Sequence, residues 1–179
     1  GDDNAYSYLP SRDGQTIADE VAMYVLNQVH PDFVQYSYLD RGSDERQYCS
    51  PGIDLPIASV MRTKYGAYKE YHTSLDDLDY VSAEGLFGAY DILSRCIEHI
   101  EDYRIYKTTI LCEPQMGRRN LRSTLGAQTD MPANTMLMSH ILVYSDGKCD
   151  VLSMANKFGV SLTDLLEIVD ILVKEGLLE

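Results

Sequence analysis

His72 is the strongest candidate for a chemical role, because it lies in a polar, acidic loop that spans residues 71–79. An imidazole in such a loop is a suitable zinc ligand, since one ring nitrogen stays open for the metal. A nearby carboxylate can accept a hydrogen bond from the other ring nitrogen and fix the tautomer, and Asp76 is the candidate for this supporting role. A histidine that is only solvated or structurally bonded gives the same pattern, so both interpretations stay open here.

The other metal-ligating residue types do not complete a site around His72. The remaining histidines are spread along the chain: His30 follows an expected helix, while His99 and His140 lie in helical runs. The four cysteines form no Cys-x-x-Cys pair, which argues against a zinc knuckle. Because a catalytic zinc uses three protein ligands, one histidine cannot hold it. We therefore expect that this chain alone does not bind zinc.

Charge and composition argue against several classes of partner. The 179 residues include 15 basic and 28 acidic side chains, which gives a formal net charge of −13. Nucleic acids and anionic membranes both attract basic proteins, so neither is an expected partner. No apolar run is long enough to span a membrane. Four widely spaced cysteines in a chain of this length favour reduced thiols and a cytoplasmic location.

Two helices are predicted ahead of the acidic loop. The first covers residues 16–29, with Thr16 as its N-cap and apolar residues at helical spacing behind it. The second is short and runs through Tyr48, with Ser43 or Asp44 as its cap. These helices belong to an α/β arrangement, because strand patterns lie between them.

Two strands and a longer helix complete the first half. Aromatic and β-branched residues predict a strand over 33–38, and the apolar run 55–61 is typical of a buried strand in a parallel sheet. The longer helix opens at Ser82. Its apolar residues recur at intervals of three and four, the spacing of a face that packs on a core. They are Leu86, Phe87, Tyr90, Leu93, Ile97 and Ile100.

The second half consists of a linker or extended arm over residues 113–133 and a small helical domain over 134–179. The linker has no sustained periodicity. Three short helices separated by two turns are typical of a helix-turn-helix arrangement. The strings at 141–147, 154–161 and 172–178 resemble winged-helix domains.

Winged-helix domains commonly bind DNA, but the charges of this one oppose that function. From Asn134 onward the chain has three lysines against seven acidic residues. The third helix carries Asp164, Glu167 and Asp170, and three carboxylates on a recognition helix repel phosphate. We expect a packing or protein-interaction module and no nucleic-acid partner.

The first half resembles the co-catalytic zinc exopeptidases, a family that includes bacterial leucyl aminopeptidases and glutamate carboxypeptidase. The string Tyr-His-Thr-x-x-Asp at 71–76 resembles the family's last metal-ligand loop, and residues 42–56 resemble the region beside its substrate pocket. A closer resemblance is to bacterial aminopeptidase-like proteins that are often encoded beside polysaccharide-biosynthesis genes and end in a winged helix. The strings that carry it lie at residues 8–12, 39–49, 61–66 and 113–119.

The resemblance implies an α/β fold with two domains. The first is a partial three-layer αβα domain over residues 1–112, and the second is the winged helix over 134–179. It also implies that the chain is the C-terminal part of a longer protein whose metal-binding half precedes it. Apolar sheet surface that this half covers would then be exposed. We expect either the missing N-terminal half as a partner or self-association.

The resemblance further implies a site and an activity for the intact protein. The activity is zinc-dependent hydrolysis of an amide at the terminus of a peptide or aminoacyl-type small substrate. His72 would be the last zinc ligand and Asp76 its support. Glu45 replaces a histidine of the family motif, so the family's substrate preference does not carry over. The residues expected near the substrate pocket are Asp44, Glu45, Arg46, Tyr48 and Tyr71.

A second function fits the same residues. The chain would belong to a catalytically inactive, aminopeptidase-like scaffold that serves as a binding or assembly module, linked to polysaccharide biosynthesis. The two hypotheses differ in the upstream ligands. His-x-Asp and Glu-Glu pairs in the preceding half would favour the enzyme, and apolar residues at those positions would favour the scaffold.

Overall fold

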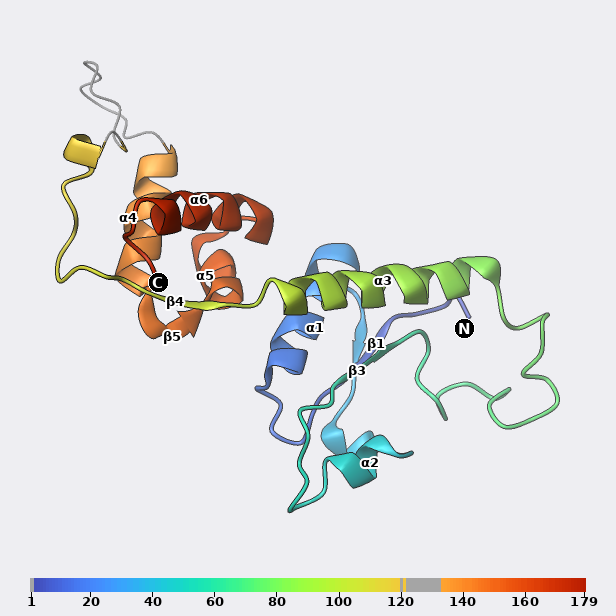
Figure 1. Ribbon diagram of the computed structural model, residues 1–179. Coiled ribbons are helices and arrows are strands. Elements are labelled where there is room, and N and C mark those ends of the chain that lie inside the picture. Colours follow the sequence, from blue (N-terminus) through green and yellow to red (C-terminus); the bar gives the residue numbers. More distant parts are fainter. Residues whose placement is uncertain (1, 120, 122–132) are drawn as a thin grey trace. The chain divides into compact units, whose positions relative to one another are not determined.

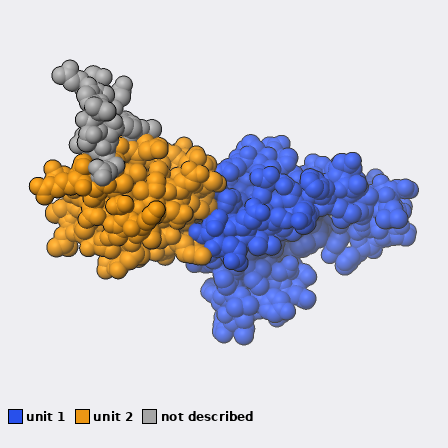
Figure 2. Space-filling view, turned by 45° about the horizontal axis from the view of Figure 1, so that its top comes forward, with its two compact units in different colours: residues 1–102 blue, residues 103–179 orange. Residues whose placement is uncertain are grey.

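The computed structural model describes residues 2–119, 121 and 133–179 (Figure 1). The chain divides into two compact units, residues 1–102 and residues 103–179, which Figure 2 shows in blue and orange. Most of the expected linker, residues 120 and 122–132, lies outside the described residues.

The first unit is built on a three-stranded sheet in the order β2-β1-β3. β1 (Ser7–Leu9) pairs in parallel with β2 (Val34–Gln35) and antiparallel with β3 (Ser59–Met61). The helices of this unit are α1 (Ile17–Val29), α2 (Glu45–Tyr48) and α3 (Ala83–Glu101), with one 3-10 turn at Tyr38–Asp40. The helix and strand content confirms a mixed α/β class for the described residues.

The predicted N-terminus of α1 is confirmed. The Thr16 backbone N–H donates to the Asp19 carboxylate at 2.9 Å, which satisfies one of the N–H groups that a helix start leaves free. The apolar face of α1 then buries Val21, Val25 and Leu26 completely or almost completely. This face packs against α3, so α1 forms the centre of the first unit's core.

Both strand predictions need correction. The strand expected over 33–38 is confined to Val34–Gln35, and the run expected as a buried parallel strand over 55–61 forms β3, which is antiparallel to β1 and half-buried. The cause lies at residues 55–57. The Ile57 N–H donates to the Leu55 carbonyl at 2.8 Å in a tight turn, and Pro56 between them has no N–H to offer a ladder.

α3 begins where the sequence predicts, with the Ser82 hydroxyl accepting from the Gly85 N–H at 2.9 Å. The face that was expected to pack on a core does not. Ile92 and Cys96 are the buried side chains, on the side that faces α1, and the predicted stripe is exposed. Its members are Leu86, Phe87, Tyr90, Leu93, Ile97 and Ile100.

The second unit combines a two-stranded sheet with helices. The sheet pairs β4 (Ile105–Lys107) antiparallel with β5 (Asp146–Asp150), and Thr108 adds a bridge to Leu178. The helices are α4 (Ala133–Tyr144), α5 (Val151–Phe158) and α6 (Leu162–Lys174), and a 3-10 turn covers Met116–Arg119. Because β4 pairs inside this unit, the division of the chain falls after Asp102, before the boundary at 112 used above.

In the second unit, helices α5 and α6 begin at residues that are typical helix caps. The Asp150 carboxylate accepts from the Ser153 N–H at 2.8 Å and begins α5, which ends at Gly159 with a φ of 67°. The Ser161 hydroxyl accepts from the Asp164 N–H at 3.1 Å and begins α6, as predicted. Together the three helices bury the unit's core, which includes Ile141, Leu152, Met154, Leu165 and Leu172.

Within the described part of the chain, none of the helices combines the length and the apolar character that crossing a bilayer requires.

Candidate functional site

The residues expected near a substrate pocket begin at α2, a helix of a single turn. Asp44 stands before its first residue, and its side chain makes no capping hydrogen bond. Arg46 and Tyr48 are exposed, with 49% of Tyr48 accessible. Glu45 is half-buried, and its Oε2 atom meets no hydrogen-bond donor among the described residues. The turn therefore presents one cation and one phenol to solvent and holds one carboxylate oxygen inward.

A buried arginine fixes the chain immediately before α2. Arg41 is only 4% exposed, and its Nη2 donates to the carbonyls of Leu9, Pro10 and Ile57 at 3.0, 2.8 and 3.1 Å. Its Nη1 donates to Ser59 Oγ at 3.1 Å. Nothing in the sequence pattern distinguishes Arg41 from a surface arginine, so sequence reasoning missed it. It ties the end of β1 and the start of β3 to the segment that carries α2.

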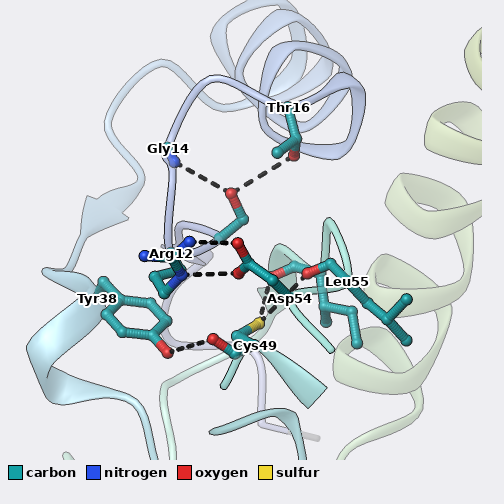
Figure 3. A network of polar contacts seen from close by, with 9 residues as sticks. Arg12, Gly14, Thr16, Tyr38, Cys49, Asp54 and Leu55 are labelled. Atoms are coloured by element: carbon teal, nitrogen blue, oxygen red, sulfur yellow. Dashed lines mark hydrogen bonds and ion pairs between the residues drawn. The ribbon is translucent and has the colours of Figure 1, made fainter. Parts of the chain in front are cut away.

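The loop that follows α2 is shaped by polar contacts with the β1–α1 connection (Figure 3). Arg12 Nε donates to Asp54 Oδ1 at 2.7 Å, and a second contact joins Arg12 Nη2 to Asp54 Oδ2. The Arg12 guanidinium holds the pKa of the Asp54 carboxyl below its usual range. On the same loop the Tyr38 hydroxyl donates to the Cys49 carbonyl at 3.5 Å. These contacts form between exposed or half-buried groups and order the loop rather than stabilise the core.

Tyr65 connects the α2 segment to the acidic loop. The Gly42 N–H donates to the Tyr65 hydroxyl at 2.7 Å, and a Cβ at Gly42 would lie 3.3 Å from the Tyr65 ring. The Tyr65 ring lies 6.2 Å from that of Tyr71, measured between centroids. A chain of contacts therefore leads from the start of α2 to the residue next to His72.

His72 is exposed and adopts a left-handed backbone conformation with a φ of 59°. Its ring stacks on Tyr71, with centroids 4.0 Å apart and planes 19° from parallel. Residues other than glycine rarely adopt a φ in this range, because it strains the backbone. Residues that do so are concentrated at functional sites. Stacking on Tyr71 orients the imidazole and leaves its ring nitrogens at the surface.

Asp76 makes contacts other than the expected hydrogen bond with His72. Its backbone N–H donates to the Thr73 carbonyl at 3.3 Å, which closes a turn of the loop. Tyr68 has a raised pKa, first because it is partly desolvated and then because the Asp76 carboxylate is close. No hydrogen bond between Asp76 and His72 is present among the described residues, and the supporting role of Asp76 stays a prediction.

Aromatic stacking organises the loop between β3 and α3, which has no regular secondary structure. Tyr68 stacks on Tyr80 with centroids 5.0 Å apart and meets Tyr71 edge-on at 5.7 Å. Lys64 Nζ lies over the Tyr65 ring at 4.4 Å from its centroid. The tyrosines of this loop therefore pack against one another.

The donors of this region do not make a metal site by themselves. Among residues 2–119, 121 and 133–179, no three histidine, cysteine, aspartate or glutamate side chains are grouped closely enough to hold an ion. His30-Pro31-Asp32 has the spacing of a His-x-Asp pair, which the sequence analysis did not use. In the structure the His30 ring stacks on Tyr6 at 4.1 Å, and Asp32 is exposed. The residues present therefore do not fit a complete zinc site.

Two surface clefts lie in the second unit. One of about 510 Å³ is lined by Glu113–Gly117 together with Thr135 and Ser139. Another of about 320 Å³ lies between Thr108–Glu113 and two residues of α4, Leu142 and Val143. None of the residues expected at a substrate pocket lines these two clefts.

Comparisons with known proteins cover the whole chain. Residues 1–103 match the family model described as "Domain of unknown function (DUF4910)", and residues 104–179 match the model described as winged helix-turn-helix. The second match confirms the predicted winged helix.

Two relatives from Clostridium acetobutylicum span the full length of this chain. One is named "Putative polysaccharide biosynthesis protein with aminopeptidase-like domain"; it is 34% identical over 180 residues, which are 100% of this chain and 41% of that protein. The other is a crystal structure of a putative peptidase, with 32% identity and a TM-score of 0.80 over 100% of this chain and 39% of that one. The chain thus spans about two fifths of the length of these relatives.

Proposed function

The chain belongs to the family described as Domain of unknown function (DUF4910), and we propose that it is the C-terminal part of an aminopeptidase-like hydrolase. One observation carries the proposal: a putative peptidase superposes on the whole chain with a TM-score of 0.80 at 32% identity. A second relative has an aminopeptidase-like domain in its printed name. The proposed reaction is hydrolysis of an amide at the terminus of a peptide or aminoacyl-type small substrate.

We propose zinc as the metal of the intact protein and a partial zinc-exopeptidase-like fold for the first unit. In this proposal His72 is a single ligand, presented at the surface by its stacking on Tyr71. The other ligands are supplied by polypeptide that this chain does not include, because the described donors form no group of three. The chain alone is therefore inactive, and no reaction step is assigned to its own residues.

The proposed substrate surface consists of α2 and the residues beside His72. The contacts of Tyr65 with Gly42 and Tyr71 support it, because they connect the two segments. Arg46 supplies an exposed guanidinium that pairs with a carboxylate of the substrate. The residues proposed to contact substrate are Asp44, Glu45, Arg46, Tyr48 and Tyr71.

Metal content tests this function. We compare the protein as its gene encodes it with two single variants, His72→Ala and the control His30→Ala, whose imidazole stacks on Tyr6. Mass spectrometry should find about two zinc ions in the wild type and the control, and fewer in His72→Ala. The 179-residue chain alone should hold none. Hydrolysis of aminoacyl anilides should follow the zinc content.

Equal zinc content in all three proteins would show that His72 is not a zinc ligand. It would not contradict the proposed hydrolase activity. Absence of zinc and of hydrolysis in every variant would overturn the hydrolase and leave the second candidate, a catalytically inactive scaffold. Its proposed context is polysaccharide biosynthesis, which the printed name of the relative also contains.

For the winged helix we propose a protein partner instead of nucleic acid. Asp164, Glu167 and Asp170 are all exposed on α6, the helix that would enter a DNA groove. For the whole chain we propose the cytoplasm, because Cys49, Cys96 and Cys112 form no disulfide among the described residues.

A further inference from the structure

The chain contains two Asp-Gly dipeptides, at residues 13–14 and 146–147, and the structure places them in different environments. In such a dipeptide the backbone nitrogen of glycine can attack the aspartate Cγ, because glycine has no Cβ to obstruct the approach. The product is a succinimide ring. Water opens this ring to aspartate or to isoaspartate, in which the main chain runs through the side-chain carbon.

The first dipeptide is open to this reaction. Asp13 and Gly14 are both exposed in the connection between β1 and α1, and the Asp13 carboxylate makes no hydrogen bond to another described residue. The neighbouring guanidinium of Arg12 bonds to Asp54 instead. A Cβ placed on Gly14 would meet no atom within 4 Å, so the glycine has open space around it for a ring to form.

The Gly14 nitrogen also has a path for its proton (Figure 3). Its N–H donates to Ser11 Oγ at 3.0 Å, and Ser11 Oγ donates to Asp19 Oδ2 at 2.5 Å. Burial raises the pKa of Asp19, but its hydrogen bonds outweigh burial and lower the pKa overall, so this carboxylate is ionised at about pH 5 and above. A hydroxyl beside an ionised carboxylate can accept one proton while it releases its own.

The second dipeptide is held in place. Asp146 Oδ1 accepts from the backbone N–H groups of Lys148 and Cys149 at 2.8 and 3.1 Å. These hydrogen bonds lower the pKa of Asp146 and keep its carboxyl ionised, and an ionised carboxylate is a poor target for a nucleophile. A Cβ placed on Gly147 would lie 3.6 Å from Lys107 Cδ, so this glycine is packed against β4.

We propose that Asp13–Gly14 is a site of spontaneous isoaspartate formation, promoted by Ser11 and Asp19. The Gly14 nitrogen bonds to Asp13 Cγ while the bond from Cγ to the hydroxyl oxygen breaks. The Gly14 proton passes to Ser11 Oγ, the Ser11 proton passes to Asp19 and on to solvent, and solvent protonates the departing oxygen. Ring formation therefore releases one water molecule, and ring opening consumes one. The inference does not depend on the proposed hydrolase.

The modification should disturb the start of the first unit. Isoaspartate at residue 13 lengthens the main chain by one atom between Ser11 and Thr16. Each of these two residues binds the Asp19 carboxylate through its hydroxyl and its backbone N–H. The longer connection should break part of this set of hydrogen bonds, so the isomerised chain should unfold at a lower temperature than the unmodified chain.

Incubation of the 179-residue chain for several weeks at about pH 5 and 37 °C tests the proposal. Chymotryptic peptides that contain each dipeptide are then separated by reversed-phase chromatography. Isoaspartate appears as a second peak of unchanged mass, which a protease specific for aspartate does not cleave at that residue. Isoaspartate at residue 13 should accumulate at least about tenfold faster than at residue 146.

Three controls separate the fold from the local sequence. In about 8 M urea the two dipeptides should react at rates within about threefold of each other, because the contacts of both are lost. Ser11→Ala removes the proton acceptor and should slow the reaction at residue 13 at least about threefold, whereas Ser50→Ala, whose hydroxyl bonds to the Arg46 carbonyl, should not. Asp13→Glu should abolish the modification at residue 13, and its unfolding midpoint should not fall during incubation.

Equal rates at the two dipeptides of the folded chain would overturn the proposal. A tenfold difference that persists in urea would also overturn it, because neighbouring residues and not the fold would then cause the difference. A folded Ser11→Ala chain that reacts as fast as the wild type, or faster, would remove Ser11 and Asp19 from the reaction. Circular dichroism establishes whether this variant is folded; if it is not, the comparison of the wild type with and without urea decides.

Discussion

Asp19 is the carboxylate on which the start of the first unit depends. It is 2% exposed and accepts hydrogen bonds from the hydroxyls of Tyr8, Ser11 and Thr16 at 2.7, 2.5 and 2.6 Å. Two backbone N–H groups, of Ser11 and Thr16, donate to it as well. Burial raises the pKa of this carboxyl, but the hydrogen bonds from Ser11 and Thr16 outweigh it, and the pKa is lowered overall.

Replacing Asp19 by Asn should lower the free energy of unfolding at pH 7 by about 2–4 kcal/mol, because an amide cannot accept from all five donors and adds donors of its own. The stabilisation of the wild type is present above the ordinary aspartate pKa of about 4 and is lost as the pH falls through the lowered value. Urea unfolding between about pH 2 and 7 measures both effects. The exposed Asp32→Asn is the control. A difference between wild type and Asp19→Asn that stays constant down to the lowest pH would contradict this account.

At the residue scale, the sequence predicts helix caps better than it predicts contacts between side chains. Thr16 was correctly identified as a helix cap because Asp19 follows at a fixed spacing. The role of Arg41 could not be predicted, since its carbonyl partners come from two distant segments. The stacking of His72 on Tyr71 depends on a left-handed φ that no sequence pattern indicates for a histidine.

Among the elements, α3 has a glycine, Gly88, that leaves no room for a side chain. Gly88 faces Tyr6 and Arg62, and an added Cβ would lie 2.5 Å from the Tyr6 hydroxyl and 2.8 Å from Arg62 Nη1. Neither group moves easily. Arg62 is 8% exposed, lies over the Tyr6 ring at 3.8 Å from its centroid, and donates through Nε to the Asp2 carbonyl at 2.9 Å.

Gly88→Ala should therefore destabilise the protein by about 1–3 kcal/mol, although alanine in an exposed helix would stabilise it by about 1 kcal/mol. Thermal unfolding measures this effect. The control is Ser94→Ala, also in α3, which should leave the midpoint unchanged or raise it. The comparison separates overpacking at Gly88 from the helix propensity of alanine. If Gly88→Ala raised the midpoint as well, the contact with Tyr6 and Arg62 would not be rigid.

Element by element, helices were predictable and strands were not. The signals of a helix, its cap and its apolar periodicity, lie close together in the sequence. The helices α1, α3, α5 and α6 accordingly begin directly after their N-cap residues. The strands have two to five residues, and their pairing depends on distant segments. The exposed apolar residues of α3 show the limit of periodicity, because the pattern identifies an apolar face but not what covers it.

For the whole molecule, net charge is the property with the widest effect. At −13 the chain repels polyanions, and α6 concentrates carboxylates at the position where a winged helix would meet DNA. The winged-helix fold was predictable from three strings of residues, and its presence alone does not decide between DNA and protein as a partner.

An electrophoretic shift assay with duplex DNA at about 50 mM salt should show no complex with the wild type, even though low salt strengthens non-specific binding. A triple variant, Asp164→Lys, Glu167→Lys and Asp170→Lys, should bind non-specifically and lose that binding as salt rises. The variant shows that the assay detects binding through α6. A wild-type complex that persisted at physiological salt would establish α6 or another surface as a nucleic-acid site.

The pairing of β4 has a consequence for the order in which the second unit is completed during synthesis. Lys107 exchanges two backbone hydrogen bonds with Glu179, at 2.8 and 2.9 Å, and the Thr109 N–H donates to the Leu177 carbonyl at 3.1 Å. A ribosome translates β4 before α4, and residues 177–179 only after α6. One edge of β4 therefore stays unpaired until the whole helical part has been translated. A nascent chain halted after α6 should hold its three helices with an open sheet edge, the form in which this unit is most exposed to misassociation with other nascent chains.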